Sequence, residues 1–219
     1  MKVLIMGCQG RMGKKLTEYC IDNNIDCCGI DVQDKKLNLG EVDVIIDFST
    51  KDALYDNLLF AYKHNLPIIV ATTGHDNNAY QLMSHYAKSI PVMVAPNLSL
   101  QFNVMCSLVK KLGLLKDNQF VLQEIHHKNK KDAPSGSAKQ LIDILSKIDI
   151  LPMTYSIRAG DVVGEHKLDV YGEQEKLSIQ HIATDRIVYC KGALCAAEYI
   201  LTKQNGLYTM ENLIDEYHK

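Results

Sequence analysis

The chain has 219 residues, of which 47% are hydrophobic and 23% are charged, which is the balance of an ordinary globular protein. This length is enough for one large domain or for two small ones that each bury a core. The formal net charge is −2, so the composition does not suggest the basic surface of a nucleic-acid-binding protein, although a local basic pocket for a small anionic substrate is still compatible with it.

The seven cysteines are odd in number and form no C-x-x-C pair, which is typical of reduced thiols in a cytosolic protein. No apolar run approaches the roughly 18 residues of a membrane span. The apolar run at the start of the sequence ends at Gly7, which is too short for the core of a secretion signal. We therefore expect a cytoplasmic protein with neither a membrane nor a nucleic acid as partner.

The first half of the sequence alternates short apolar runs with helical periodicity, a pattern typical of βαβ units in a doubly wound parallel sheet. The segment from Val32 to Glu41 is shorter than the dozen or so residues that a parallel crossover normally needs, so we expect a loop there. The expected strands are 3–6, 26–31, 42–47, 67–71 and 91–94, and the expected helices lie around 12–20, 54–62 and 78–89.

The pattern changes after Pro96-Asn97, where a long apolar helix is followed by alternating, strand-like segments. The expected fold class is therefore α/β: an N-terminal Rossmann-like doubly wound parallel sheet plus a C-terminal α+β domain with a mixed open sheet. We expect a dinucleotide-binding domain over 1–97, completed by a C-terminal helix at about 194–219, and a second domain over 98–193. The expected elements here are helix 99–115, strand 120–126, helix 137–147, strands 155–158, 167–171 and 177–181, and closing helices 186–202 and 209–217.

Three glycines, Gly7, Gly10 and Gly13, follow the first expected strand with the spacing G-x-x-G-x-x-G. Glycine allows the backbone to approach a pyrophosphate closely, and the helix N-terminus that follows offers N–H groups to it. Asp31, at the end of the second expected strand, suits the adenosine ribose hydroxyls. The alternative is a tight glycine turn in another α/β protein.

The carboxylate of Asp31 favours NADH, because it would repel the 2′-phosphate of NADPH. Lys35 and Lys36 lie close behind and could attract that phosphate, or they could belong to a solvated loop. We predict NADH as cofactor and leave NADPH open as a second one. Ala71-Thr72-Thr73-Gly74 and Ala95-Pro96-Asn97 each follow an expected parallel strand, where ligands of doubly wound sheets bind, but taken alone they are better explained by ordinary turn and N-cap chemistry.

The segment from His126 to Ser137 reads HHKNKKDAPSGS and runs from a strand into a helix. Histidine exchanges protons near neutral pH, lysine donates a proton or binds a carboxylate, and the N–H groups at Gly136 and Ser137 can bind a second carboxylate. These groups suit a dicarboxylate that receives a hydride and a proton. A solvated basic loop is the alternative. We predict no metal site, because His126 and His127 point to opposite faces of a strand and no further ligand completes a zinc set.

Taken together, these motifs resemble the 4-hydroxy-tetrahydrodipicolinate reductase family, whose members are also called dihydrodipicolinate reductases. The resemblance runs from about Lys2 to Leu213, and its most specific part is the histidine–lysine segment. It is carried by G-x-x-G-R-M-G, Asp47-Phe48-Ser49, Thr72-Thr73-Gly74, Ala95-Pro96-Asn97, H-H-x-x-K-x-D-A-P-S-G-S, and 158–166.

The resemblance implies an oxidoreductase of diaminopimelate and lysine biosynthesis that uses NADH or NADPH to reduce (2S,4S)-4-hydroxy-2,3,4,5-tetrahydrodipicolinate to 2,3,4,5-tetrahydrodipicolinate. It also implies a homotetramer, so that the domain 98–193 binds substrate and mediates oligomerisation. By position, His126 is the proton donor and acceptor, Lys130 is a proton donor, and His127, Gly136 and Ser137 bind substrate. The implied cofactor-binding residues are Gly7, Cys8, Gln9, Gly10, Arg11, Met12, Asp31, Ala71, Thr72, Thr73, Ala95, Pro96, Asn97 and Leu98.

The chain departs from the family pattern at Lys128-Asn129, where members often have Arg-His, and the stretches between Asp31 and Val42 and between Ile148 and Tyr155 are short. Two other functions stay open from the sequence. One is a different Rossmann oxidoreductase, such as an aspartate or homoserine dehydrogenase. The other is a non-catalytic nucleotide-sensing protein, although the presence of both His126 and Lys130 argues against it.

Overall fold

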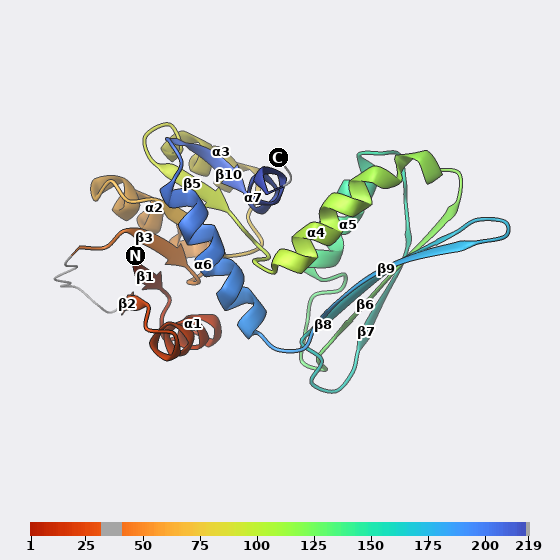
Figure 1. Ribbon diagram of the computed structural model, residues 1–219, viewed down its shortest axis with the longest axis horizontal. Helices are drawn as coiled ribbons and strands as arrows, with labels where there is room; N and C mark the ends of the chain where they lie inside the picture. The colour runs from red at the N-terminus through yellow and green to blue at the C-terminus, as the bar shows by residue number, and fades with distance from the viewer. Residues whose placement is uncertain (32–40, 218–219) are drawn as a thin grey trace. The chain divides into compact units, whose positions relative to one another are not determined.

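The computed structural model describes residues 1–31 and 41–217, and the chain divides into two compact units (Figure 1). The first unit contains residues 1–100 and 187–219, and the second contains 101–186. The expected second boundary, between 193 and 194, falls inside helix α6 (Ile187–Leu201), which belongs as a whole to the first unit. The reason is packing, because Cys190 and Ala197 lie in the same core as Val3 and Ile5.

The first unit contains a parallel sheet of six strands in the order β10-β5-β4-β3-β1-β2. Five of these strands confirm the expected doubly wound arrangement. The sixth, β10, was not predicted, because it is an edge strand of four residues, none of which is buried. The strands are β1 (Lys2–Met6), β2 (Asp26–Ile30), β3 (Val44–Asp47), β4 (Ile68–Val70), β5 (Pro91–Val94) and β10 (Gly206–Thr209).

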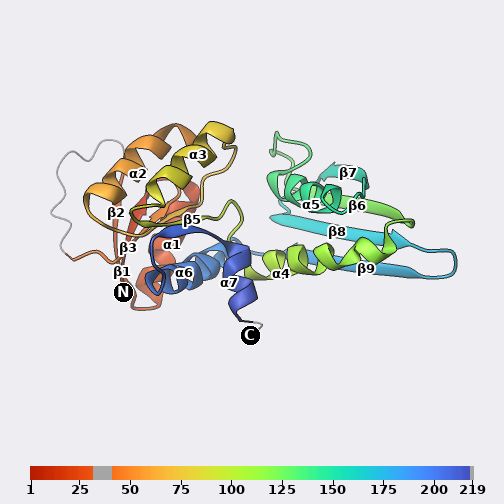
Figure 2. The same ribbon diagram turned by 90° about the horizontal axis from the view of Figure 1, so that it is seen from above.

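Helices cover both faces of this sheet, because alternate strand residues point to opposite sides (Figure 2). Val3 and Ile5 of β1 pack with helices α1 (Arg11–Asp22), α6 and α7 (Met210–Glu216). Leu4 and Met6 pack with α2 (Leu54–Lys63) and α3 (Asn77–Tyr86) on the other side. A short 3-10 turn, η1 (Lys51–Ala53), precedes α2. The apolar runs identified in the sequence are thus strands buried on both faces.

The strand order reverses at β1, which lies between β3 and β2. In doubly wound sheets the crevice at such a reversal, outside the carboxyl ends of the strands, is where ligands bind. The segments that begin at Gly7, Asp31 and Phe48 follow β1, β2 and β3 and therefore meet at this edge. The loop expected between the second and third strands lies in 32–40, outside the described residues.

The second unit is built on a four-stranded mixed sheet in the order β7-β6-β8-β9. The pair β6–β7 is parallel and the other two pairs are antiparallel, which confirms the expected mixed open sheet. Helix α5 forms the crossover between the two parallel strands. The elements are α4 (Leu100–Val109), the 3-10 helix η2 (Lys110–Leu115), β6 (Gln119–His126), α5 (Gly136–Ser146), β7 (Met153–Arg158), β8 (Gly164–Tyr171) and β9 (Lys176–Ala183).

The two faces of the second sheet differ in what covers them. One face packs against α4, η2 and α5, and its core contains Phe120, Leu122, Leu168 and Val170 (Figure 1). The strand register places Glu124, His166 and His181 in one row across β6, β8 and β9 on this same covered face. The site described below lies at the end of that row.

The opposite face of the second sheet exposes apolar side chains. Met153, Tyr155 and Ile157 of β7 are 56%, 51% and 37% exposed, and Ile182 of β9 is 48% exposed. Register aligns Ile157 with Ile125, Glu165 and Ile182 in one row. A face of this kind on a sheet is suited to burial against another surface. Among the described residues, no helix is long and apolar enough to span a membrane.

Candidate functional site

The glycine-rich loop after β1 is packed so closely that side chains are excluded at two of its positions. Gly7 has a φ of +75°, and a Cβ there would lie 2.7 Å from the Cα of Ser49. A Cβ at Gly13 would lie 2.6 Å from the Cα of Cys8 and would overlap the carbonyl oxygen of Gly7. The loop therefore has the tight turn and the close contact between strand and helix that a dinucleotide fold requires.

Helix α1 begins immediately after this loop and presents its N-terminus at the same edge of the sheet. Its N-cap is Gly10, so no side chain occupies the first N–H groups, and the first turn of the helix contains no acidic residue. Asp31 follows β2, and its Oδ2 accepts a hydrogen bond from the N–H of Gln9 at 3.2 Å. A helix N-terminus of the kind that can bind an anion and a carboxylate thus lie on the two sides of one loop.

The remaining expected cofactor residues follow β4 and β5. Since all these strands are parallel, the segments 71–73 and 95–98 lie at the same edge as the glycine loop. The Thr72 hydroxyl is hydrogen-bonded to Nε2 of His75 at 2.7 Å. Leu98 is buried, and its backbone lies so close to Gly192 of α6 that a side chain at that glycine would overlap it. The sequence placed all fourteen expected cofactor residues on segments that the fold brings to one edge.

One buried residue at this edge was not identified as functional from the sequence. The Asp47 side chain is fully buried, and its Oδ1 accepts hydrogen bonds from the backbone N–H of Ser49 at 2.9 Å and from its hydroxyl. Its Oδ2 has no hydrogen-bond partner among the described residues. Burial lowers the pKa of nearby His75, and the negative charge of Asp47 partly offsets this. Its place within the motif Asp47-Phe48-Ser49 was the only sequence signal.

In the second unit, His126 is the last residue of β6 and is buried, with 7% of its surface exposed. Its Nδ1 is paired with Oε2 of Glu124, which lies two residues earlier on the same face of the strand and is fully buried. Burial is the main reason why the pKa of His126 is lowered, and the Glu124 charge opposes that shift. His126 is therefore a neutral imidazole near pH 7 with one nitrogen held by a carboxylate.

Arg158, the last residue of β7, is aligned with His126 in the parallel strand pair. Its NH2 group donates to Oε1 of Glu124 at 2.8 Å and to the carbonyl of Asp132 at 2.5 Å, and its Nε donates to the carbonyl of Lys130 at 3.3 Å. Burial alone would raise the pKa of Glu124, but hydrogen bonds from Arg158, Ser156 and His126 outweigh it and lower the pKa. Glu124 is therefore ionised.

Lys130 lies in the loop between β6 and α5, and its Nζ forms an ion pair with Oδ1 of Asp132 at 2.8 Å. Burial would raise the pKa of Asp132, but hydrogen bonds from Lys130 and from the backbone N–H of Gly136 lower it. Ser135 is the N-cap of α5, and its hydroxyl accepts from the N–H of Ala138 at 3.1 Å. The Asp132 carboxylate therefore already accepts hydrogen bonds from two donors, Lys130 in the loop and the N–H of Gly136 at the helix terminus.

The expected substrate-binding residues lie around this loop. His127 follows β6 and is half-buried, Gly136 is the exposed first residue of α5, and Ser137 is half-buried at the next position. The sequence therefore identified the residues of one local segment. It did not identify Glu124, Arg158 or His166, because two of them come from strands distant in the sequence and a charged residue within a strand has no distinctive pattern.

Glu124, His126 and His166 also place one potential ligand atom each within 4.8 Å of one another, which is a geometry that a metal ion could use. Burial, with smaller effects of the neighbouring histidines, lowers the pKa of His166 to about 3, so this ring is neutral. Both oxygens of Glu124 are, however, already engaged by Arg158 and His126. A guanidinium at this distance disfavours a second cation, and we interpret the group as a hydrogen-bond network.

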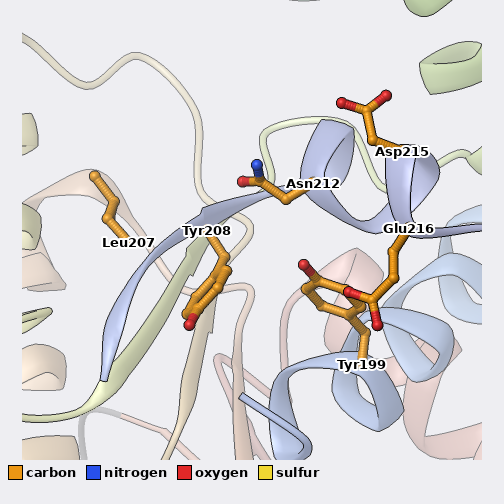
Figure 3. Close-up of a pocket in the computed structure, with 6 residues that line it drawn as sticks. All are labelled: Tyr199, Leu207, Tyr208, Asn212, Asp215 and Glu216. Carbon is orange, nitrogen blue, oxygen red and sulfur yellow. The ribbon is translucent and has the colours of Figure 1, made fainter. Parts of the chain in front are cut away.

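The first unit also contains a pocket of about 430 Å³ lined by side chains of α6, β10 and α7 (Figure 3). Its wall includes Tyr199 and Tyr208, whose rings meet edge to face at 6.1 Å, and Glu216, which is paired with Lys203. The lining residues are Tyr199, Leu207, Tyr208, Asn212, Asp215 and Glu216. None of them belongs to the glycine loop or to the expected cofactor segments, so the pocket is separate from the candidate site.

Comparison with known proteins gives the same family for both parts of the chain. The family model described as "Dihydrodipicolinate reductase, N-terminus" matches residues 23–98, and "Dihydrodipicolinate reductase, C-terminus" matches residues 101–214. The 4-hydroxy-tetrahydrodipicolinate reductase of Bdellovibrio bacteriovorus is 35% identical and covers 97% of this chain and 96% of its own length. That of Zymomonas mobilis is 34% identical, with coverages of 97% and 96%.

Solved structures agree in fold. The dipicolinate-bound dihydrodipicolinate reductase from Paenisporosarcina sp. TG-14 matches with a TM-score of 0.81 at 18% identity, covering 97% of this chain and 98% of its own. An aspartate semialdehyde dehydrogenase from Vibrio cholerae matches less well, with a TM-score of 0.57 at 9% identity, and covers 91% of this chain and 97% of its own. With both family models and full-length relatives above 30% identity in agreement, the chain belongs to the dihydrodipicolinate reductase family.

Proposed function

We propose that this chain reduces (2S,4S)-4-hydroxy-2,3,4,5-tetrahydrodipicolinate to 2,3,4,5-tetrahydrodipicolinate with a nicotinamide cofactor, and that His126 and Lys130 move the protons of this reaction. The reaction and its place in diaminopimelate and lysine biosynthesis follow from the family. The observation that carries the residue assignment is the buried Glu124–His126 pair beside the Lys130–Asp132 ion pair at the start of α5.

The residues of the first unit fit a dinucleotide. Gly7 and Gly13 allow the tight turn and the close strand–helix contact of a dinucleotide fold, and the N-terminus of α1 is available to a pyrophosphate. The cofactor, when bound, supplies the hydride. Asp31, which follows β2, would accept hydrogen bonds from the ribose hydroxyls of the adenosine, and its negative charge supports NADH as the preferred cofactor with NADPH as a weaker one. The other residues proposed to line the cofactor are those of segments 8–12, 71–73 and 95–98.

The second unit supports binding of a dicarboxylate. In this structure the Asp132 carboxylate accepts hydrogen bonds from Lys130 and from the N–H of Gly136. A substrate carboxylate has the same acceptor geometry, so it can take over these donors together with Ser137 and His127. Holding the substrate at both carboxylates fixes the ring relative to the proton donors, which supplies much of the rate.

Protons are moved by His126 and Lys130. Because burial lowers the pKa of His126, the ring is neutral at pH 7 and can accept a proton as well as return it. The ammonium of Lys130 is a proton donor. It also neutralises the substrate carboxylate once that carboxylate has replaced Asp132 as its partner. The 4-hydroxyl group and one ring proton leave as water, and the ring carbon that gains negative charge when the cofactor's hydride adds would be protonated from within the same loop.

The test is an assay of NADH or NADPH oxidation with purified protein, in which a coupled synthase forms the substrate from pyruvate and aspartate semialdehyde. We expect oxidation that depends on the synthase and is faster with NADH. Replacing Lys130 with Ala should lower kcat by about 100-fold or more while leaving the Kd for NADH unchanged. Undiminished turnover in Lys130→Ala would remove lysine from the mechanism, and absence of oxidation by folded wild-type protein would refute the substrate assignment.

We also propose that the chain is a cytoplasmic homotetramer whose subunits meet through the second sheet. The support is the exposed apolar row on β7, with Met153, Tyr155 and Ile157, which no helix of the second unit covers. The molar mass in solution tests this proposal, and a monomer at micromolar concentration would contradict it.

A further inference from the structure

We infer that Glu124 and Arg158 act as one positioning unit for the proposed proton transfer: Glu124 fixes the tautomer of His126, and Arg158 ties the same carboxylate to the loop that carries Lys130. The inference rests on the proposed function, and it adds two residues that do not belong to the histidine–lysine segment. Neither is proposed to touch the substrate.

Glu124 is a fully buried carboxylate whose oxygens are both used. Oε2 is paired with Nδ1 of His126, and Oε1 accepts from Arg158 at 2.8 Å and from the backbone N–H of Ser135 at 3.3 Å. A buried ionised carboxylate is stable only when it is paired in this way, because desolvation is otherwise costly. The strand register supports the arrangement, since Glu124 and His126 are alternate residues on one face of β6.

The ionised carboxylate determines which nitrogen of His126 carries the hydrogen. Because Glu124 has only acceptor atoms, Nδ1 of the neutral ring must be the N–H nitrogen, and Nε2 is left as the nitrogen that accepts a proton. Gly164 of β8 packs beside this nitrogen, since a Cβ there would lie only 3.1 Å from Nε2. The ring is therefore held at Nδ1, and Nε2 is the nitrogen that remains for proton exchange.

Arg158 connects this ring to the loop. One guanidinium donates to Glu124 and also to the carbonyls of Lys130 and Asp132, so the position of the loop backbone is fixed relative to the carboxylate that holds His126. Arginine suits this role because its planar fork makes several hydrogen bonds in fixed directions. The two proposed proton-transferring groups are thus placed by a single ion pair.

His166 completes the covered row without adding charge. It aligns with Glu124 across β6 and β8, its ring lies 5.2 Å from that of His126, and its Nε2 is 3.3 Å from the Ser135 hydroxyl. Phe102 of α4 packs against it at a ring distance of 5.2 Å. A neutral, buried surface of this kind lowers the local dielectric constant and strengthens the interaction between Glu124 and its partners.

The decisive measurement is the tautomer of His126, read from imidazole ¹⁵N and ¹H chemical shifts in wild-type protein. We expect the Nδ1–H form. In Glu124→Gln, whose amide can donate to the ring, we expect a shift toward the Nε2–H form and a fall in kcat of about 100-fold or more with an unchanged Kd for NADH. The apparent pKa of His126 in the pH–rate profile should move lower, because Glu124 raises the pKa of that ring.

Arg158→Lys separates the second half of the inference from the first. Lysine keeps a positive charge beside Glu124 but lacks the planar fork that also donates to the carbonyls of Lys130 and Asp132. Glu124 should therefore stay ionised and the Nδ1–H form should persist, while the KM for substrate rises by about tenfold because the loop with Lys130 is no longer fixed. Asp143→Asn is the matched control. It removes one carboxylate charge from an exposed ion pair with Lys147 on α5 at 2.7 Å and should leave both readouts unchanged.

An Nε2–H tautomer in the wild type overturns the inference even if Glu124→Gln does not fold. Wild-type kcat and KM in both folded variants would also overturn it. His126→Ala distinguishes these results from failure of the proposed function: if it is inactive while Glu124→Gln is fully active, only the positioning unit is refuted, and if it is fully active, the role of His126 is refuted. If a chelator abolished activity and zinc alone restored it, the group of Glu124, His126 and His166 would be a metal site and not a hydrogen-bond network.

Discussion

In each unit the candidate site lies in the loop between a strand and the helix that follows it, but the two loops differ in what forms the site. In the first unit, the loop after β1 depends on the absence of side chains, because Gly7 and Gly13 allow backbone segments to pack closely against each other. In the second unit, the loop after β6 depends on hydrogen bonds and ion pairs between side chains. Glu124 is paired with both His126 and Arg158. One site is sensitive to added atoms and the other to removed charges.

This difference matches the two ligands. A dinucleotide pyrophosphate is bound by N–H groups and helix dipole, and these donors are available only where no side chain intervenes. A reacting dicarboxylate needs proton donors held in fixed positions, and these come from side chains that must themselves be held. The comparison predicts that substitutions in the first unit act on cofactor binding and those in the second act on turnover.

Among substitutions in the first unit, the largest effect is expected from Gly13→Ala. Its new Cβ would overlap the carbonyl of Gly7 and approach the Cα of Cys8, so the loop must open. We expect a loss of stability of about 1–3 kcal/mol and at least a tenfold rise in the Kd for NADH. Denaturant unfolding and NADH fluorescence titration measure the two quantities. Gly113→Ala is the control, because a Cβ there meets nothing closer than Ile148 at 3.9 Å; equal effects in both variants would contradict the close-packing argument.

The same contrast explains what the sequence could predict. Gly7 and Gly13 are recognisable in the sequence because a backbone requirement leaves one residue type at a fixed spacing, and Asp31 is recognisable because it ends the next strand. His126 and Lys130 are recognisable because they lie in one short segment. Strand β10 was missed because it is a short edge strand.

The residues that contact the histidine–lysine segment could not be found in this way. Glu124 looks like an ordinary polar residue in a strand, and Arg158 is 34 residues away along the chain. Their contact with each other depends on the register between β6 and β7, which the hydrophobic pattern of neither strand specifies. The residues that position a site are therefore harder to predict than those that form it.

A smaller effect is expected from acid on the second unit. Burial lowers the pKa of His166 from 6.5 to about 3, so the unfolded chain binds a proton that the folded chain does not between these values. Stability contributed by the neutral ring is complete above pH 6.5 and is lost as pH falls, by roughly 1–2 kcal/mol between pH 6.5 and 5. His166→Asn should flatten the dependence of Tm on pH in that window, where carboxylates contribute little. An unchanged slope in this variant would show that His166 is not the group responsible.

The smallest effect is expected from Asp31→Asn. Asp31 is only partly buried beside the glycine-rich loop, and its Oδ2 accepts a long hydrogen bond, 3.2 Å from the N–H of Gln9, so we expect little change in stability when its charge is removed. A charged hydrogen bond to the ribose would be lost, which raises the Kd for NADH by about tenfold, or ~1.4 kcal/mol. NADPH should bind more tightly than before, because its 2′-phosphate is no longer repelled. Titration with both cofactors gives the ratio of the Kd for NADPH to the Kd for NADH. If this ratio equals that of the wild type, Asp31 does not face the adenosine ribose. Since the change lies wholly in the first unit, the tautomer of His126 should stay the same, so this variant also checks that the two sites are built independently.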